Sequence, residues 1–182
     1  MKILIISGSR NPEGQTARAA GALLEGASAE GIEGEMIFLP QLIIERCRQC
    51  DEDGWGICSK ESHCIIKDDF ASTFQKIKET DVVIFATPVY FGNLSESLRA
   101  FTDRLSRICF KGGGNKDTAD KPVIGICVAG GGGFGAPECC FHLDKVLRIC
   151  GFNVIDMIPA RRQNLESKLP YLRMIGRGLS KY

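Results

Sequence analysis

Hydrophobic residues occur along the chain in short continuous runs that alternate with segments of helical periodicity. The runs lack polar alternation, so they predict strands that are buried on both faces of a sheet. They occupy residues 2–7, 35–39, 81–86, 123–129 and 153–158. Between the runs, apolar residues recur every three or four positions, which predicts amphipathic helices. These helical patterns span Ala17–Ala27, Phe70–Ile77, Leu94–Ile108 and Phe141–Cys150, and a glycine-rich linker is expected at 111–120.

The alternation of strands and helices predicts an α/β protein, in which helices cover both faces of a parallel sheet. With five strands, we expect a doubly wound, flavodoxin-like sheet with the strand order 2-1-3-4-5. Ligands of such a sheet bind beyond the carboxyl ends of the strands, at the switch point between strands 1 and 3. The corresponding loops are residues 7–16, 87–93 and 130–135.

Length, charge and hydropathy predict a single domain without a nucleic-acid or membrane partner. The chain has 182 residues, which predicts one domain over residues 1–182, because domains usually contain about 100–200 residues. Its net charge of +1 argues against a nucleic-acid partner. No apolar run reaches the roughly 18–20 residues of a membrane span, and the apolar start is too short for a signal peptide. We therefore expect a cytoplasmic protein with no membrane partner.

The first loop has the composition of an anion site. It leaves a buried strand, contains Gly8 and the hydroxyls of Ser9 and Thr16, and opens a helix. Backbone N–H groups at a helix N-terminus bind phosphate, and Arg10 adds a charge-assisted contact. The segment is not a Walker A loop, because Gly14-Gln15-Thr16 lacks the required lysine. An ordinary capped turn is the alternative interpretation.

The second loop suits a flat ring. Thr87-Pro88-Val89-Tyr90-Phe91-Gly92-Asn93 brings backbone groups and aromatic side chains to the carboxyl end of a strand. A flat heteroaromatic ligand can bind to such a surface. The alternative is a capped turn that carries a surface tyrosine.

The third loop contains four consecutive glycines, which allow the backbone to approach a planar ligand closely. It also fits the pattern G-x-G-x-x-G at Gly130, Gly132 and Gly135, and Asp156 follows about 20 residues later. That combination is typical of a dinucleotide site. A classical NAD-binding dehydrogenase is therefore an alternative interpretation.

Together, these loops resemble the NADPH-dependent FMN reductase branch of the flavodoxin-like proteins. Gly8-Ser9-Arg10 with Gln15-Thr16 resembles the phosphate loop, 87–93 resembles the flavin-ring loop, and 98–104 resembles the helix that follows. The resemblance covers roughly residues 2–160 and implies bound FMN and NAD(P)H-dependent reductase activity. It also implies a homodimer or homotetramer, with small-molecule or protein electron carriers as partners.

The resemblance implies specific FMN ligands. No catalytic acid or base is expected, because the flavin itself carries the hydride chemistry. The residues expected at the phosphate are Ser9, Arg10, Gln15, Thr16 and Ala17. Those expected at the ring are Pro88, Val89, Tyr90, Phe91, Gly92, Asn93, Gly130, Gly131, Gly132 and Gly133.

Nine cysteines are unusual for a protein of a reducing compartment, where clustered thiols indicate metal or redox chemistry. Four of them lie in a cysteine-rich loop at about 40–67, as Cys47-x2-Cys50-x7-Cys58-x5-Cys64. With the following Lys67-Asp68-Asp69, this stretch resembles the iron–sulfur flavoproteins of the same family and implies a [4Fe–4S] cluster on four thiolates.

The cysteine spacing departs from the C-x2-C-x2-C motif of that family, because residues 51–57 widen the second gap. Zinc bound by the same four thiolates, or no metal at all, stays open. His63 is read as a solvated loop residue. The other cysteines are expected to pack as small hydrophobic residues; they are Cys109, Cys127, Cys139, Cys140 and Cys150.

The alternative to a reductase is a non-catalytic metal- or redox-sensing adaptor on the same fold, which would keep the cysteines without reductase activity.

The basic segment 161–182, with six Lys or Arg residues and one Glu, is expected to form a solvated or subunit-packing helix. Its charge could instead bind the phosphate of NADPH or an anionic partner.

Overall fold

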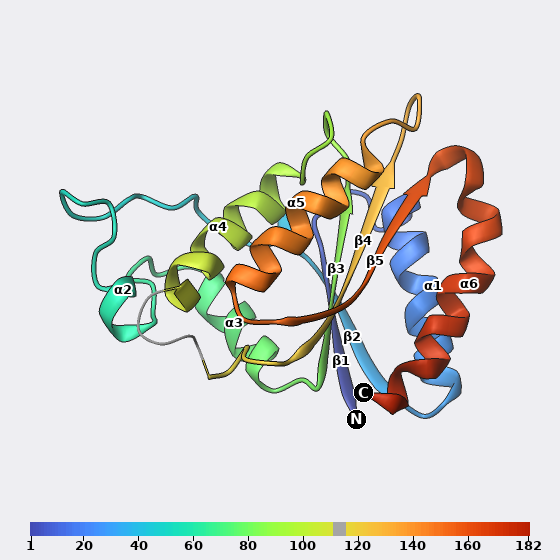
Figure 1. Ribbon diagram of the computed structural model, residues 1–182, viewed down its shortest axis with the longest axis horizontal. Helices are drawn as coiled ribbons and strands as arrows, with labels where there is room; N and C mark the ends of the chain where they lie inside the picture. The colour runs from blue at the N-terminus through green and yellow to red at the C-terminus, as the bar shows by residue number, and fades with distance from the viewer. Residues whose placement is uncertain (111–115) are drawn as a thin grey trace.

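The computed structural model describes residues 1–110 and 116–182. Five parallel strands form one sheet in the order β2-β1-β3-β4-β5, which confirms the predicted flavodoxin-like order (Figure 1). The strands are β1 (Lys2–Ser7), β2 (Glu33–Phe38), β3 (Val82–Pro88), β4 (Pro122–Ala129) and β5 (Asn153–Arg161).

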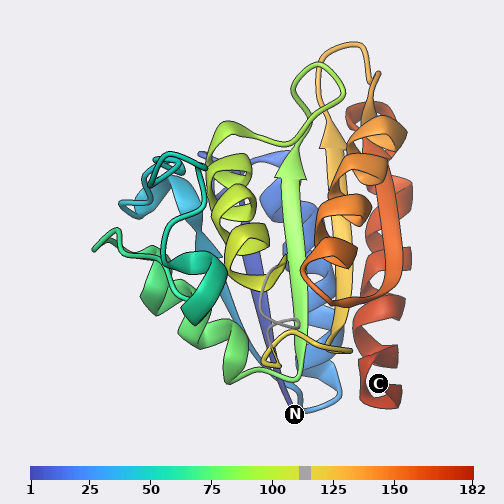
Figure 2. The same cartoon turned by 60° about the vertical axis from the view of Figure 1, so that its left-hand side comes forward.

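Helices cover both faces of the sheet, because successive residues of a strand point to opposite sides. On β1, Ile3 and Ile5 contact the core under α1 and α6, whereas Leu4 and Ile6 contact the core under α3, α4 and α5 (Figures 1 and 2). The helices are α1 (Gln15–Ala29), α2 (Cys58–Glu61), α3 (Phe70–Lys78), α4 (Glu96–Phe110), α5 (Ala136–Ile149) and α6 (Leu165–Arg177), with 3-10 turns at Leu39–Gln41, Arg162–Asn164 and Gly178–Lys181. Within the described ranges, no helix is both long and apolar enough to cross a membrane.

Boundaries at the two sheet edges differ from those expected. The edge strand β2 begins at Glu33, before the predicted start, because its first residues are exposed and give no apolar signal. At the other edge, β5 continues past the predicted end to Arg161, since its pairing with β4 extends to Ala129. Residues 111–115 of the expected linker lie outside the described residues, and its remainder forms a turn.

The basic C-terminal segment is part of the fold. The apolar face of α6 lies on α1, where Leu165, Leu169 and Leu172 are buried. The two helices approach closely at glycines: a Cβ on Gly26 would lie 2.1 Å from the Arg173 carbonyl oxygen, and one on Gly176 would lie 2.0 Å from the Leu23 carbonyl oxygen. The apolar face of the expected helix is therefore covered by this chain's own α1, whereas Arg161, Arg162 and Arg177 are exposed, as a solvated face requires.

The close approach of α1 and α6 predicts opposite effects for two alanine substitutions within α1. Gly26→Ala should lower the free energy of unfolding by about 1–3 kcal/mol, because the methyl group would overlap α6 backbone. Gly21→Ala should raise it by up to about 1 kcal/mol, because nothing lies within 4 Å of the new group and alanine favours the helix. Urea unfolding followed by circular dichroism measures both, and a stabilised Gly26→Ala variant would contradict this packing.

Candidate functional site

The loops after β1, β3 and β4 lie together at the carboxyl edge of the sheet (Figure 2). The first loop is held against the start of α4 and the end of β3. The N–H of Gly8 donates to the Ala86 carbonyl at 2.8 Å, and the Ser97 hydroxyl donates to the Gly8 carbonyl at 3.2 Å. A Cβ on Gly8 would lie 2.2 Å from the Ser95 Oγ and 3.0 Å from the Leu98 Cβ, so any larger residue would displace the Ser95 side chain.

The predicted phosphate residues gather at the N-terminus of α1. Gly14 is the N-cap without a side-chain cap, and the first turn carries no acidic residue. Thr16 is buried in that turn, whereas Arg10 is exposed and lines a large groove between this loop and α4. The Ser9 hydroxyl donates to the Asn11 carbonyl at 3.1 Å and therefore serves the loop itself. The positive end of the α1 dipole, with Arg10 beside it, suits an anion.

The second loop is a tight turn at the end of β3. Tyr90 and Asn93 exchange two backbone hydrogen bonds of 3.0 Å. Phe91 and Gly92 between them have φ values of 50° and 76°, as in a type I′ turn. A left-handed backbone is costly for phenylalanine, and such strain is found at binding sites more than elsewhere. The Phe91 side chain is fully exposed.

The third loop touches the second through its last glycine. A Cβ on Gly135, where φ is 83°, would lie 2.8 Å from the Gly92 backbone. At Gly130 and Gly131, in contrast, a Cβ would meet nothing within 4 Å. The glycines at the start of this loop therefore border open space, where a planar ligand can approach the backbone.

The interpretation as an NAD-binding dehydrogenase requires Asp156 to lie at the carboxyl edge of the sheet, and it does not. Asp156 lies within β5, five residues before the strand ends at Arg161, which is about 16 Å at the rise of a strand. Its carboxylate accepts a hydrogen bond of 3.4 Å from the Tyr171 hydroxyl of α6. The ribose-binding acid of a dinucleotide site stands at a carboxyl edge, so Asp156 does not meet that requirement.

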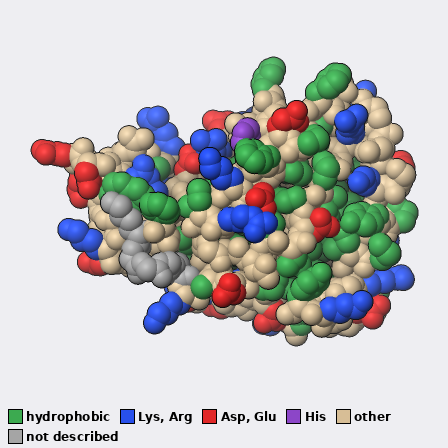
Figure 3. Space-filling view, in the orientation of Figure 1, with side chains coloured by type: hydrophobic (Ala, Val, Ile, Leu, Met, Phe, Trp, Pro, Cys, Tyr) green, Lys and Arg blue, Asp and Glu red, His purple; other side chains and the backbone are tan. Residues whose placement is uncertain are grey.

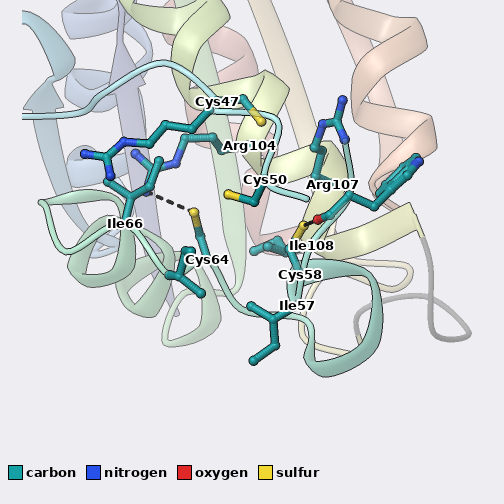
Figure 4. Close-up of a pocket in the computed structure, with 12 residues that line it drawn as sticks. Cys47, Cys50, Ile57, Cys58, Cys64, Ile66, Arg104, Arg107 and Ile108 are labelled. Atoms are coloured by element: carbon teal, nitrogen blue, oxygen red, sulfur yellow. Dashed lines mark hydrogen bonds between the residues drawn. The ribbon is translucent and has the colours of Figure 1, made fainter. Parts of the chain in front are cut away.

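The four predicted metal-ligating cysteines line a single cavity between the cysteine-rich loop and the C-terminal half of α4. Figure 4 shows their sulfur atoms turned toward the same space. The empty space of this cavity, including its open mouth, is about 360 Å³. The thiols are Cys47, Cys50, Cys58 and Cys64, with apolar walls from Ile57, Ile66 and Ile108.

The widened gap between Cys50 and Cys58 folds back on itself. Asp51, Gly54 and Gly56 all have positive φ, which reverses the chain direction within a few residues. A Cβ on Gly56 would lie 2.8 Å from the Cys50 Cβ, so the end of the insert contacts its beginning. The chain two residues before Cys58 therefore lies against Cys50 despite the longer spacing.

The thiols influence one another electrostatically. Burial raises the pKa of the Cys58 thiol, the neighbouring Cys64 thiol raises it further, Arg107 lowers it, and Cys47 and Cys50 raise it. The Cys58 thiol donates a hydrogen bond to the Trp55 carbonyl. Without a bound cation, a group of thiols this close disfavours several simultaneous thiolates. Within the described part of the chain, no three His, Cys, Asp or Glu side chains stand in an arrangement for a single metal ion.

A buried ion pair supports this loop, and sequence reasoning missed it. Arg104 of α4 and Asp68 have side chains that are 1% and 2% exposed, and Nη1 and Nη2 bind the two carboxylate oxygens at 2.6 and 3.0 Å. The same carboxylate accepts hydrogen bonds from the N–H groups of Glu45 and Phe70. Although burial alone would raise the pKa of Asp68, these hydrogen bonds and the Arg104 charge hold it below its ordinary value. A charged residue within the apolar stripe of α4, between Phe101 and Ile108, was the available signal.

The remaining cysteines and histidines are not part of this cavity. His63 is exposed and its Nδ1 lies 3.5 Å from a Glu61 carboxylate oxygen. The structure buries the other five cysteines among apolar side chains, as expected for small hydrophobic residues. They are Cys109, Cys127, Cys139, Cys140 and Cys150.

A parallel sheet of this strand order is the flavodoxin-like class of α/β folds, in which ligands bind beyond the carboxyl ends of the strands. Within that class, the sequence pattern of the NADPH-dependent FMN reductases matches residues 1–163, and the chain belongs to this family. The resemblance of the loops is thereby confirmed at the level of the family.

Individual relatives agree with this assignment. An iron-sulfur flavoprotein of Methanocaldococcus jannaschii is 38% identical over 104 residues, which cover 57% of this chain and 51% of that protein. An iron-sulfur flavoprotein of Methanosarcina thermophila is 32% identical over 132 residues, which cover 72% and 64% of the two chains. The chain thus spans about half to two thirds of the length of these curated relatives. A solved NAD(P)H:quinone oxidoreductase from Methanothermobacter marburgensis has the same fold, with a TM-score of 0.73 and 20% identity over 98% of this chain and 96% of that one.

The buried ion pair generates a stability prediction. Asp68→Ala leaves the Arg104 guanidinium buried without its carboxylate, so we expect the free energy of unfolding to fall by about 3–5 kcal/mol. Asp69→Ala is the matched control, because Asp69 accepts an exposed hydrogen bond from the Ile43 N–H and its loss should cost about 1 kcal/mol. Urea unfolding at neutral pH measures both. Equal losses in the two variants would contradict the role of the pair.

The difference in the free energy of unfolding between wild-type protein and Asp68→Ala should depend on pH. The pKa of Asp68 is lowered in the folded chain, so its contribution to stability is fully present above the ordinary carboxyl pKa of about 4. That contribution is lost as the pH falls through the lowered value. The difference between wild-type protein and Asp68→Ala should therefore shrink on acidification.

Proposed function

We propose that the chain is an FMN-binding, NAD(P)H-linked oxidoreductase that exchanges electrons through a [4Fe–4S] centre on Cys47, Cys50, Cys58 and Cys64. The observation that carries the cluster is the convergence of these four thiols on one cavity, in a member of the FMN reductase family. Relatives named iron-sulfur flavoproteins support it. We further propose that the chain acts as one domain in the cytoplasm.

The loops at the carboxyl edge would hold FMN. The free N-terminus of α1, Arg10 and Thr16 suit its phosphate, and the backbone of 88–93 and Gly130–Gly133 suits its ring. Bound FMN supplies hydride acceptance and one-electron chemistry. The residues of this chain bind and orient the ring and exclude water from it, and no side chain is assigned a proton-transfer role.

The cysteine loop would hold the metal centre. Four thiolates are the usual ligand set of a [4Fe–4S] cluster, and zinc takes the same ligands. The fold-back at Gly56 keeps Cys58 with the others despite the wide spacing. The residues present therefore supply the four donors of such a centre around one cavity, and the thiols would have to close together around the bound metal.

We also propose that the protein is a homodimer or homotetramer. Phe91 and Phe134 are 108% and 85% exposed on the loops of the carboxyl edge, and Phe141 of α5 is exposed as well. Figure 3 shows hydrophobic side chains protruding at this edge of the molecule. Large exposed aromatic side chains that gather at one edge are typical of interaction surfaces. Small-molecule or protein electron carriers would be the other partners.

The function is tested on protein purified without oxygen. We expect a flavin spectrum with a broad cluster absorbance, about four iron and four sulfide per chain, and oxidation of NADH or NADPH. Cys50→Ser should lose the iron, because it removes one ligand, whereas His63→Asn should keep it. Flavin without iron or sulfide would leave a simple reductase. Bound metal without NAD(P)H oxidation would favour a non-catalytic sensing adaptor.

The phosphate loop is tested by a matched pair of arginines. Arg10→Gln should weaken FMN binding roughly tenfold to a hundredfold, because a charge-assisted hydrogen bond is worth about 1.5–3 kcal/mol. Arg18→Gln also removes one positive charge, but Arg18 lies on α1 and pairs with Glu166 outside the loop. This variant should therefore keep its affinity for FMN. Quenching of FMN fluorescence on binding measures both. Unchanged affinity in Arg10→Gln would contradict the placement of the phosphate.

A further inference from the structure

The Arg104 guanidinium has more N–H donors than its ion pair with Asp68 uses. Nη1 and Nη2 bind Asp68, and Nη1 also donates to the Glu45 carbonyl at 3.1 Å. Nη2 donates in addition to the Cys64 Sγ at 3.4 Å (Figure 4). Within the described residues, Nε is buried and has no hydrogen-bond partner. A buried N–H without a partner is costly and requires an explanation.

Arg104 also forms part of the wall that the four thiols face, so its guanidinium borders the space that a thiolate-bound centre would occupy. Arg107, one turn further along α4, lines the same wall, lies 4.6 Å over the Trp55 ring and donates to the Gly54 carbonyl. Asp68 neutralises the Arg104 guanidinium, and Glu45 neutralises that of Arg48, which also lines the cavity. The wall therefore keeps an uncompensated positive charge among isoleucine side chains.

Four thiolates around a metal centre carry the opposite charge. A [4Fe–4S] core or a zinc ion leaves the assembly with a net charge of about −2, and uptake of one electron by the iron–sulfur form makes it about −3. Apolar surroundings strengthen the attraction of nearby cations, and hydrogen bonds to the sulfur atoms stabilise the more negative state. Two arginines beside the thiols thus match the charge that this centre would add.

We propose that Arg104 and Arg107 form the cationic wall of the thiolate centre, and that Arg104 is a positioning residue that holds the Cys64 sulfur through an N–H···S hydrogen bond. This inference rests on the proposed cluster. The wall stabilises the reduced form of the centre and raises its reduction potential. Asp68 keeps the Arg104 guanidinium in place and prevents the wall from carrying two uncompensated charges.

The test is a redox titration of the iron–sulfur signal in the full-length, FMN-loaded protein, followed by electron paramagnetic resonance. Arg104→Lys keeps a cation beside Asp68 but loses the second N–H for Cys64. Arg107→Gln removes a charge that has no carboxylate partner among residues 1–110 and 116–182. For each, we expect the equilibrium to move toward the oxidised form by about tenfold, which is about 59 mV more negative for one electron. Arg99→Gln is the control, because Arg99 lies on the same helix but pairs with Asp103 outside the cavity.

The outcomes separate the wall from the cluster. Shifts in both cavity variants at wild-type iron content, with none in Arg99→Gln, support the proposal. Wild-type potentials in both cavity variants overturn it and leave the cluster standing. Wild-type protein that takes up neither iron nor sulfide overturns the cluster and, with it, the wall. If circular dichroism shows that Arg104→Lys does not fold, the reduction potential of Arg107→Gln is compared with that of Arg99→Gln. A shift in Arg107→Gln alone then supports the cationic wall, and equal potentials overturn it.

Discussion

A guanidinium and a carboxylate that are both almost completely shielded from solvent hold the cysteine-rich loop against α4. Arg104 comes from the middle of α4, and Asp68 from the segment that leads into α3. Hydrogen bonds from the Glu45 N–H to Asp68 and from Arg104 to the Glu45 carbonyl add the beginning of the loop. A long segment with only one short helix thereby has a defined position, because loss of either charge would leave the other buried and unpaired.

Helix α4 borders both candidate sites. Near its N-terminus, Ser95 and Ser97 contact the loop that follows β1, and in its C-terminal half Arg104 and Arg107 line the cysteine cavity. Seven residues separate Ser97 from Arg104, which is about 10 Å along a helix. Because a packed helix is rigid, the two sites keep a fixed spacing on this chain. The α1–α6 pair lies on the opposite face of the sheet, where the N-terminus of α1 borders the carboxyl-edge site. None of its described residues lines the cysteine cavity.

The two sites use backbone in different ways. At the carboxyl edge, glycines let loops touch: Gly8 meets α4, and Gly135 meets Gly92. Backbone groups of these loops are thereby brought together without side chains between them. At the cysteine cavity, Gly56 instead reverses the chain, and side chains supply all the chemistry. A planar cofactor and a thiolate-bound centre require this difference, because one is bound mainly by backbone amides and the other by sulfur.

The parallel sheet, its strand order and the loops at its carboxyl edge could be predicted from the sequence, because buried runs and helical periodicity are local signals. The four cysteines were visible in the same way. Only the tertiary structure decided that their thiols share a cavity, since Gly56 folds the insert back onto Cys50. It also decided that Arg104 is buried beside Cys64, because its partner Asp68 lies 36 residues away in the chain. Contacts between distant segments depend on how the elements pack, and no local pattern encodes them.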